Sequence, residues 1–239
     1  MNPVAVIRRR GARPSCRPAA VTLACLAAAT LASCGADTGP NGIASQSAER
    51  VLARAQAAAS SAATVHVIGS IVGAARPISI DMELVSGKGG TGHATLGGVD
   101  VELIQVNGWL YVRGNAPLMR RLVGATAATK LGRRWLKAPA THGPLAPLAT
   151  LTDLRRLIPE TLADHHQLSR DGRSTVDGQP TLALADNVER ATLYVASTGT
   201  PYPLALVKRG RAAGRISFDR WNKPVTLLAP PNPINIKAL

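Results

Sequence analysis

Aromatic side chains are scarce in this chain: three tryptophans, three tyrosines and one phenylalanine account for 3% of its 239 residues. Hydrophobic residues nevertheless make up 46% of the sequence, so any core is built mainly from Ala, Val, Leu and Ile. Aromatic rings usually fill the large volumes of a protein interior, and their scarcity is compatible with an interior that is left partly open. Small aliphatic side chains also pack densely, so composition alone does not distinguish an open interior from a closed one.

Acidic residues are absent from the first 33 positions, whose charged side chains are all arginines. These are Arg8, Arg9, Arg10, Arg13 and Arg17. An apolar stretch from Ala19 to Ala32 follows them, and small residues end it. This is the layout of a signal peptide, and the apolar stretch is too short to span a bilayer comfortably as a permanent anchor. We therefore predict that residues 1–33 are a signal peptide for the general secretion route.

Cysteine is rare as well, and its three copies lie within the first 34 residues. Cys34 ends the run Leu31-Ala32-Ser33-Cys34, which is typical of a bacterial lipobox. We predict that Cys34 receives an S-diacylglycerol group, becomes the first residue of the mature chain and is acylated at its new amine. Such an anchor is stable, because each buried methylene contributes about 0.8 kcal/mol. The alternative is ordinary secretion with Cys34 as a free thiol, but a lone exported thiol invites unwanted pairing.

The net charge of +14 falls to +9 without the leader, which holds five of the 28 basic residues and none of the 14 acids. An exported protein meets no nucleic acid, so its expected counterparts are anionic lipid headgroups, acidic glycolipids or the wall polymer. A solvated basic surface without any partner is the alternative. The candidate headgroup contacts are the basic clusters Arg120-Arg121, Arg133-Arg134, Arg155-Arg156 and Lys208-Arg209-x-Arg211.

The mature chain is predicted to have three parts. Residues 34–45 form the lipidated N-terminus and a small, polar tether, residues 46–231 form one domain, and residues 232–239 form an extended tail. Helical spacing of apolar residues predicts helices over 46–62, 116–130 and 150–164.

Alternating apolar and polar residues predict strands before and after the central helices. Ile78–Leu84 alternates at every position, and an Asn107-Gly108 hairpin turn precedes a strand that begins at Trp109. Further short strands follow an Asp177-Gly178 turn near the other end of the domain. Antiparallel strands on both sides of a helical insert predict an α+β fold with one large, curved sheet and few helices to cover it.

Two patterns imitate functional motifs. Gly87–Gly92 matches G-x-G-x-x-G, but the residues after it read as strand rather than the helix that a dinucleotide site needs. A glycine-rich hairpin turn is expected there. His165-His166, beside Asp164, lacks a second pair at ligand spacing, so we expect surface histidines at a helix end rather than a metal site. No catalytic constellation stands out, so neither an enzyme activity nor a cofactor is expected.

Several segments combine into a more specific pattern through their order and spacing. They are Gly108–Arg113, Gly132-x-x-Trp135-Leu136, Val176-Asp177-Gly178-Gln179-Pro180, Leu193–Ala196 with Thr200-x-x-Pro203-Leu204, and Ile216–Val225. In these segments the chain resembles the actinobacterial LppX/LprG lipoprotein family, whose fold is related to the LolA/LolB lipoprotein carriers. The resemblance covers nearly all of the mature chain, from the first helix to Pro231.

The resemblance implies a half-barrel sheet packed on helices around a hydrophobic cavity for the acyl chains of lipids or lipoglycans. It also implies that the protein carries or presents these lipids at the outer face of the plasma membrane, together with an envelope lipid transporter. A protein-interaction module of the same fold that carries nothing is the alternative. The candidate cavity residues are aliphatic side chains of the predicted elements: Ile78, Ile80, Met82, Leu84, Val101, Leu103, Leu110, Val112, Leu122, Leu154, Leu193, Val195, Leu204 and Leu206.

Overall fold

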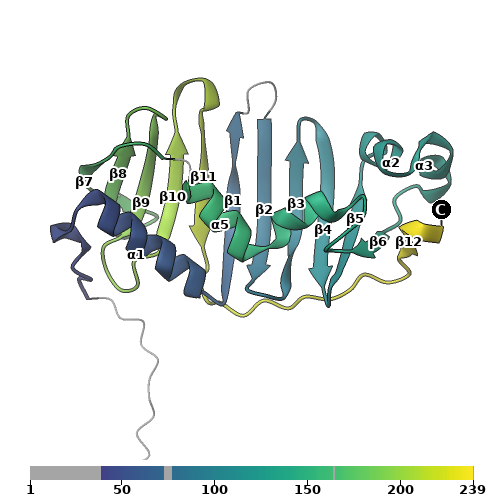
Figure 1. Cartoon of the computed structure of the whole chain (residues 1–239), viewed down its shortest axis with the longest axis horizontal. Coiled ribbons are helices and arrows are strands. Elements are labelled where there is room, and N and C mark those ends of the chain that lie inside the picture. The colour runs from purple at the N-terminus through teal and green to yellow at the C-terminus, as the bar shows by residue number, and fades with distance from the viewer. Residues whose placement is uncertain (1–38, 73–76, 164, 239) are drawn as a thin grey trace, which may run out of the picture. The chain divides into compact units, whose positions relative to one another are not determined.

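A single open, curved sheet of twelve strands is the framework of the computed structural model, which describes residues 39–72, 77–163 and 165–238. The predictions for the leader, for Cys34 and for residues 35–38 lie outside this part. The described residues cluster into one compact unit. The strand order across the sheet is β12-β6-β5-β4-β3-β2-β1-β11-β10-β9-β8-β7 (Figure 1). Neighbouring strands are antiparallel, except that β12 runs parallel to β6.

The strands on the first side of the helical insert are β1 (Thr64–Val72), β2 (Pro77–Val85), β3 (Gly89–Leu96), β4 (Val99–Val106) and β5 (Trp109–Gly114). The others are β6 (Leu136–Pro139), β7 (Leu168–Val176), β8 (Gln179–Asp186), β9 (Ala191–Ala196), β10 (Pro203–Lys208), β11 (Gly214–Asp219) and β12 (Ile234–Asn235). The α-helices are α1 (Ala48–Ser61), α2 (Ala116–Val123), α3 (Ala125–Leu131), α4 (Ala146–Ala149) and α5 (Leu154–Ala163). The short 3₁₀ turns are η1 (Ile43–Ser45), η2 (Thr150–Thr152), η3 (Gly210–Ala212) and η4 (Ile236–Ala238).

The alternation in Ile78–Leu84 sorts the side chains of β2 to two faces of the sheet. Met82 and Leu84 are fully buried, whereas Asp81, which precedes Met82, is exposed and Glu83 between them is half-buried. Residues directly opposite in an antiparallel pair share a face, so Met82 lies beside Val67 of β1 in the main core. We call this the helix-covered face and the opposite side the outer face.

Two helices, α1 and α5, lie across the helix-covered face (Figure 1). The Ser47 side chain accepts the backbone N–H of Arg50 and so caps the start of α1. Each helix buries one stripe of small or aliphatic residues at helical spacing. The stripes are Val51, Leu52, Ala55, Ala58 and Ala59 on α1, and Leu154, Ile158 and Leu162 on α5.

Glycines in β3 allow the segment before α5 to come close to the sheet. A Cβ on Gly90 would lie 2.7 Å from the Leu84 Cδ2 atom and 3.2 Å from the Thr152 carbonyl oxygen of η2. Thr152 itself is fully buried. The glycine-rich turn expected at Gly87–Gly92 is shorter in the structure. The connection between β2 and β3 spans Ser86–Lys88, because Gly89 already begins β3.

The helical insert differs from the prediction in two places. The single helix predicted over 116–130 is wrong, because Gly124 adopts a φ of +81° and separates α2 from α3. The helix predicted over 150–164 starts as η2 and becomes regular only at Leu154. Pro159 lies inside α5 and removes one backbone hydrogen-bond donor from it.

Two strands at the sheet edges had no clear sequence signal. Strand β7 is exposed at most of its positions and pairs with β8 through an irregular register between Arg170 and Arg173. At the other edge, the residues that we assigned to a tail include β12, and the Ile234 N–H donates to the Trp135 carbonyl over 2.8 Å. A long irregular segment joins β11 to β12 along one end of the sheet (yellow in Figure 1).

The predicted α+β fold with one large, curved, mostly antiparallel sheet is confirmed, and the sheet is not closed into a barrel. Within the described residues, no helix combines the length and the hydropathy needed to cross a membrane.

Candidate functional site

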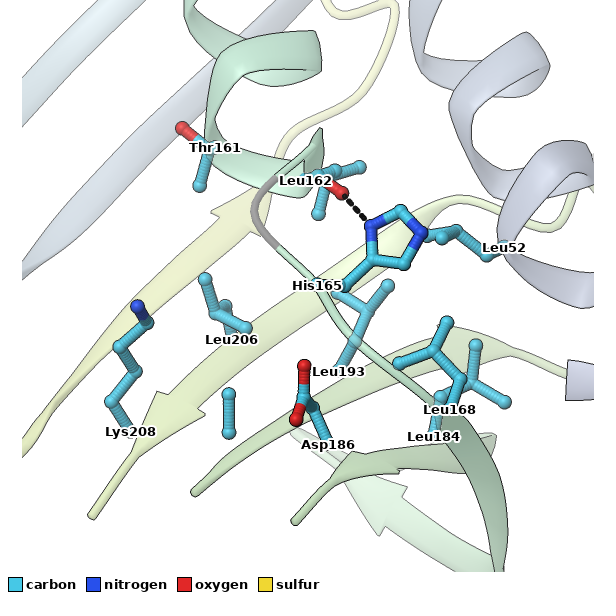
Figure 2. Close-up of a pocket in the computed structure, with 11 residues that line it drawn as sticks. Leu52, Thr161, Leu162, His165, Leu168, Leu184, Asp186, Leu193, Leu206 and Lys208 are labelled. Carbon is cyan, nitrogen blue, oxygen red and sulfur yellow. Dashed lines mark hydrogen bonds between the residues drawn. The ribbon is translucent and has the colours of Figure 1, made fainter. Parts of the chain in front are cut away.

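An apolar pocket lies between the helix-covered face of β8–β10 and the helices α1 and α5 (Figure 2). Leucines supply most of its lining, and they come from both layers. The sheet contributes Leu168, Leu184, Leu193 and Leu206, α1 contributes Leu52, and α5 contributes Leu162. The pocket encloses about 410 Å³ of space between atoms, which includes solvent at its mouth.

The pocket is narrow in this structure. The volume open to the centre of a water molecule is about 30 Å³, which is room for about two waters. A larger ligand would fit to the full depth of the pocket only if α1 or α5 were farther from the sheet. Moving a helix away from the sheet removes apolar contacts between the two layers. A ligand that separates them therefore has to replace this contact area with its own apolar surface.

Strand register explains why these leucines converge. Leu193 of β9 is directly opposite Leu184 of β8 on one side and Leu206 of β10 on the other. The three side chains therefore form one row on the helix-covered face. The next row consists of Asp186, Ala191 and Lys208, in which the small Ala191 leaves space between two charged side chains.

Asp186 is the buried polar group of the pocket, with a residue exposure of 4%. Its carboxylate accepts the backbone N–H groups of His166, Val188 and Glu189 over 2.7, 2.9 and 3.0 Å. Burial raises the pKa of Asp186, but these three hydrogen bonds and the nearby His166 outweigh burial, so the pKa is lowered. Asp186 therefore stays ionised at neutral pH and holds the β8–β9 turn in place.

Three other polar side chains lie around the pocket: Thr161, His165 and Lys208. His165 follows α5, and its Nδ1 donates to the Leu162 carbonyl over 3.1 Å. Figure 2 shows the imidazole ring extending from this bond toward Leu52. Lys208 pairs with Glu189 at 3.7 Å. The pocket thus has an apolar interior and a polar margin, which suits an amphiphile better than a fully polar ligand.

Of the fourteen predicted cavity residues, Leu193 and Leu206 line this pocket. Seven others are buried in the main core. They are Met82, Leu84, Val101, Leu103, Leu110, Val112 and Leu154. Val195 also belongs to the main core, on the strand that carries Leu193. Their contact with a lipid stays a prediction.

The remaining predicted residues lie at less enclosed positions. Ile80 and Leu122 are partly buried against the main core, and Ile78 is 45% exposed near the start of β2. Leu204 packs in a second, smaller cluster with Ala205 on the outer face. A register shift between Pro203 and Ala205 breaks the alternation of β10, which separates Leu204 from Leu206.

Several residues that line the pocket were not among the cavity residues predicted from the sequence. Leu184 and Leu162 lie in segments that were predicted correctly as strand and helix, but the pairing that brings them together is long-range. Leu168 lies in β7, which is too polar to be recognised as a strand. His165 was expected at the surface at a helix end; it is exposed there, and it also borders the pocket.

His165 and His166 do not form a metal site with neighbouring groups. His166 faces Asp186 and Glu189 at 3.8 Å each, whereas His165 bonds to a backbone carbonyl. In the part of the chain that the structure describes, no three His, Cys, Asp or Glu side chains are placed to hold a metal ion.

Comparison with solved structures identifies related folds. LprF from Mycobacterium bovis superposes with a TM-score of 0.54 at 15% identity, over 77% of this chain and 96% of LprF. The lipoprotein LppX from Mycobacterium tuberculosis gives 0.48 at 18% identity, over 75% of this chain and 98% of LppX. No protein-family model and no curated protein sequence matches the chain. The chain therefore has the fold of LprF, and its resemblance to the LppX/LprG lipoproteins is confirmed at the level of the fold.

Proposed function

We propose that the mature protein is an envelope lipoprotein that binds the acyl chains of a lipid or lipoglycan in the pocket between α1, α5 and β8–β10. It carries or presents this lipid at the outer face of the plasma membrane. The observation that supports this proposal most strongly is the leucine-lined pocket with a polar margin, in a fold shared with LprF.

The physical basis is the low solubility of lipid monomers in water. Each exposed methylene costs about 0.8 kcal/mol, so a carrier has to offer an apolar site that tolerates chains without fixing them through many directional bonds. Leu193, Leu206 and Leu52 provide such a surface, and the hydrogen bonds of Asp186 are directed to its own turn rather than into the pocket.

The anchor belongs to the same proposal. Lipidation of Cys34 attaches the domain to the plasma membrane, and the short segment after it keeps the domain near the lipids of the outer leaflet. An envelope lipid transporter is the expected partner that delivers or receives the cargo. The proposed role involves neither an enzymatic reaction nor nucleic acid.

Lipid loading of two variants on one strand tests the pocket. Leu206→Trp fills the pocket with an indole ring, and Val207→Trp places the same ring on the outer face of β10, where the native side chain is half-buried. Both variants and the unaltered mature chain are expressed in the native host and analysed by native mass spectrometry. We expect a co-purifying lipid mass in the unaltered chain and in Val207→Trp, and its loss in Leu206→Trp.

Two results contradict the proposal. A bare protein mass from the native host for the unaltered chain would favour the alternative, a protein-interaction module of the same fold, with which the narrow pocket also agrees. Equal lipid loading of both tryptophan variants would place the lipid elsewhere. Melting curves of the variants show whether each one is folded, since overpacking a core costs about 1–3 kcal/mol.

A further inference from the structure

A polar hollow, which contains Arg190 and Arg209 as well as Asp171 and Asp186, adjoins the apolar pocket at the turn between β8 and β9. It is lined by residues of β7, by the β8–β9 turn with the adjoining strand ends, and by Arg209, which follows β10. It encloses about 990 Å³ of space that is open to solvent. Asp186 and Ala191 line both the hollow and the pocket. The row Asp186–Ala191–Lys208 is therefore the boundary between an apolar compartment and a polar one.

Two arginines lie immediately beyond this boundary. Arg190 precedes Ala191 in the chain, Arg209 follows Lys208, and both side chains are exposed in the hollow. The Arg190 carbonyl accepts the Arg209 N–H over 2.9 Å, which fixes the two residues side by side. Arg190 adopts a φ of +53°, a conformation that is uncommon for residues other than glycine.

Neither arginine forms an ion pair with a described residue, although Asp171 and Asp186 lie in the same hollow. Among the described residues, no acid lies within ion-pair distance of Arg190 or Arg209. The nearby Glu189 pairs with Lys208 at 3.7 Å, and Asp186 is occupied by three backbone N–H groups. Asp171 also lines the hollow and is exposed. A phosphate or carboxylate that reached both exposed guanidinium groups would accept charge-assisted hydrogen bonds from each of them.

We propose that the pocket takes amphiphiles with an anionic headgroup, whose chain occupies the leucine-lined pocket and whose headgroup binds Arg190 and Arg209. This inference rests on the proposed function, because it assigns the chemical class of the lipid that the pocket binds. The chain of such a ligand leaves the pocket past Ala191, the small residue of the boundary row, and the headgroup reaches the hollow over the β8–β9 turn.

The test compares two single-chain probes that differ only in a phosphate: myristoyl lysophosphatidic acid and monomyristoylglycerol. The mature chain with Cys34→Ala, which needs no detergent, is titrated with each probe below its critical micelle concentration. We expect about five- to tenfold tighter binding of the phosphate probe. The double variant Arg190→Gln/Arg209→Gln should reduce this preference to about twofold or less, whereas Lys130→Gln/Lys223→Gln, which removes the same charge at two exposed residues outside the hollow, should preserve it.

The outcomes separate this inference from the function on which it rests. Equal affinity for the two lipid probes, or an unchanged preference in Arg190→Gln/Arg209→Gln, overturns the headgroup site while the lipid pocket stands. Binding of glycerol 3-phosphate as tight as that of the phosphate probe also overturns it, because the hollow would then bind a free phosphate without the chain. Failure of both lipid probes to bind contradicts the proposed function itself.

Discussion

The Thr152 hydroxyl lies 2.7 Å from the side-chain carbonyl oxygen of Gln105, and this contact ties η2 to β4 on the helix-covered face. The same hydroxyl lies 2.8 Å from the Ala149 carbonyl. Thr152 is fully buried, so water cannot replace either contact. The start of α5 is thus fixed to the sheet by a polar bond, whereas its other end, beside the pocket, lies over apolar side chains of the sheet.

Thr152→Val tests this polar attachment. Valine has nearly the same shape but leaves the Gln105 and Ala149 oxygens without the hydroxyl, so we expect a loss of about 1–2 kcal/mol in the free energy of unfolding. Thr129→Val on α3 is the matched control, because the Thr129 hydroxyl bonds to Ala125 within the same helix and is exposed. Urea denaturation measures both variants, and equal stabilities would contradict the role of Thr152.

Gly90→Ala tests the close approach of η2 to β3. The added Cβ would lie 2.7 Å from Leu84 Cδ2 and 2.8 Å from the Glu83 carbonyl oxygen, so neighbouring atoms have to shift. We expect a destabilisation of about 1–3 kcal/mol. Thr91→Ala changes the next residue of the same strand, which faces the other side, and should stay within about 0.5 kcal/mol of the unaltered protein. A tolerated Gly90→Ala would show that the sheet does not require this space.

Asp186→Asn should reduce stability in a pH-dependent way. The pKa of Asp186 is lowered below its ordinary value of 3.8 in the folded protein, so its ionised form contributes stability above that value. This contribution is lost as the pH falls through the lower folded pKa, where Asp186 becomes protonated in both states. Urea denaturation should therefore show a deficit of about 1–3 kcal/mol for Asp186→Asn at pH 7 and a smaller deficit near pH 3. A deficit that is the same at both pH values would contradict this role.

Cys34→Ala tests the predicted anchor. Metabolic labelling of the native host with an alkyne-tagged fatty acid should label the unaltered protein and not Cys34→Ala, because the variant lacks the thiol that receives diacylglycerol. Cys25→Ala, in the apolar part of the leader, is the control and should keep the label. Persistent labelling of Cys34→Ala would show that the lipid, if any, is attached elsewhere.

The sequence predicted the parts of this fold that depend on local patterns. The alternation in Ile78–Leu84 and the turn at Asn107-Gly108 identified β2, β4 and β5, because one buried face imposes a period of two on a strand. The polar strand β7 and the two-residue β12 carry no such period. The break at Gly124 was missed because a helical stripe continues on both sides of it, and only the backbone conformation shows that the helix ends.

The pocket was predicted only in part for a similar reason. Leu193 and Leu206 were identified from strand patterns, but the register that places them opposite each other depends on pairing between distant segments. The bulge near Leu204 depends on the same pairing. Asp186 and His165 had no recognisable motif, since their roles arise from a turn and a helix end that meet in the folded protein.

The most direct test of the proposed function is photo-crosslinking with a diazirine-bearing fatty acid, followed by peptide mass spectrometry. The pocket predicts crosslinks to Leu52, Leu193 and Leu206, which come from three separate elements that meet there. Tyr194 and Val207, their neighbours on the outer face, should remain unlabelled. Crosslinks spread over both faces of the sheet, or confined to the outer face, would contradict an acyl-chain site between α1, α5 and β8–β10.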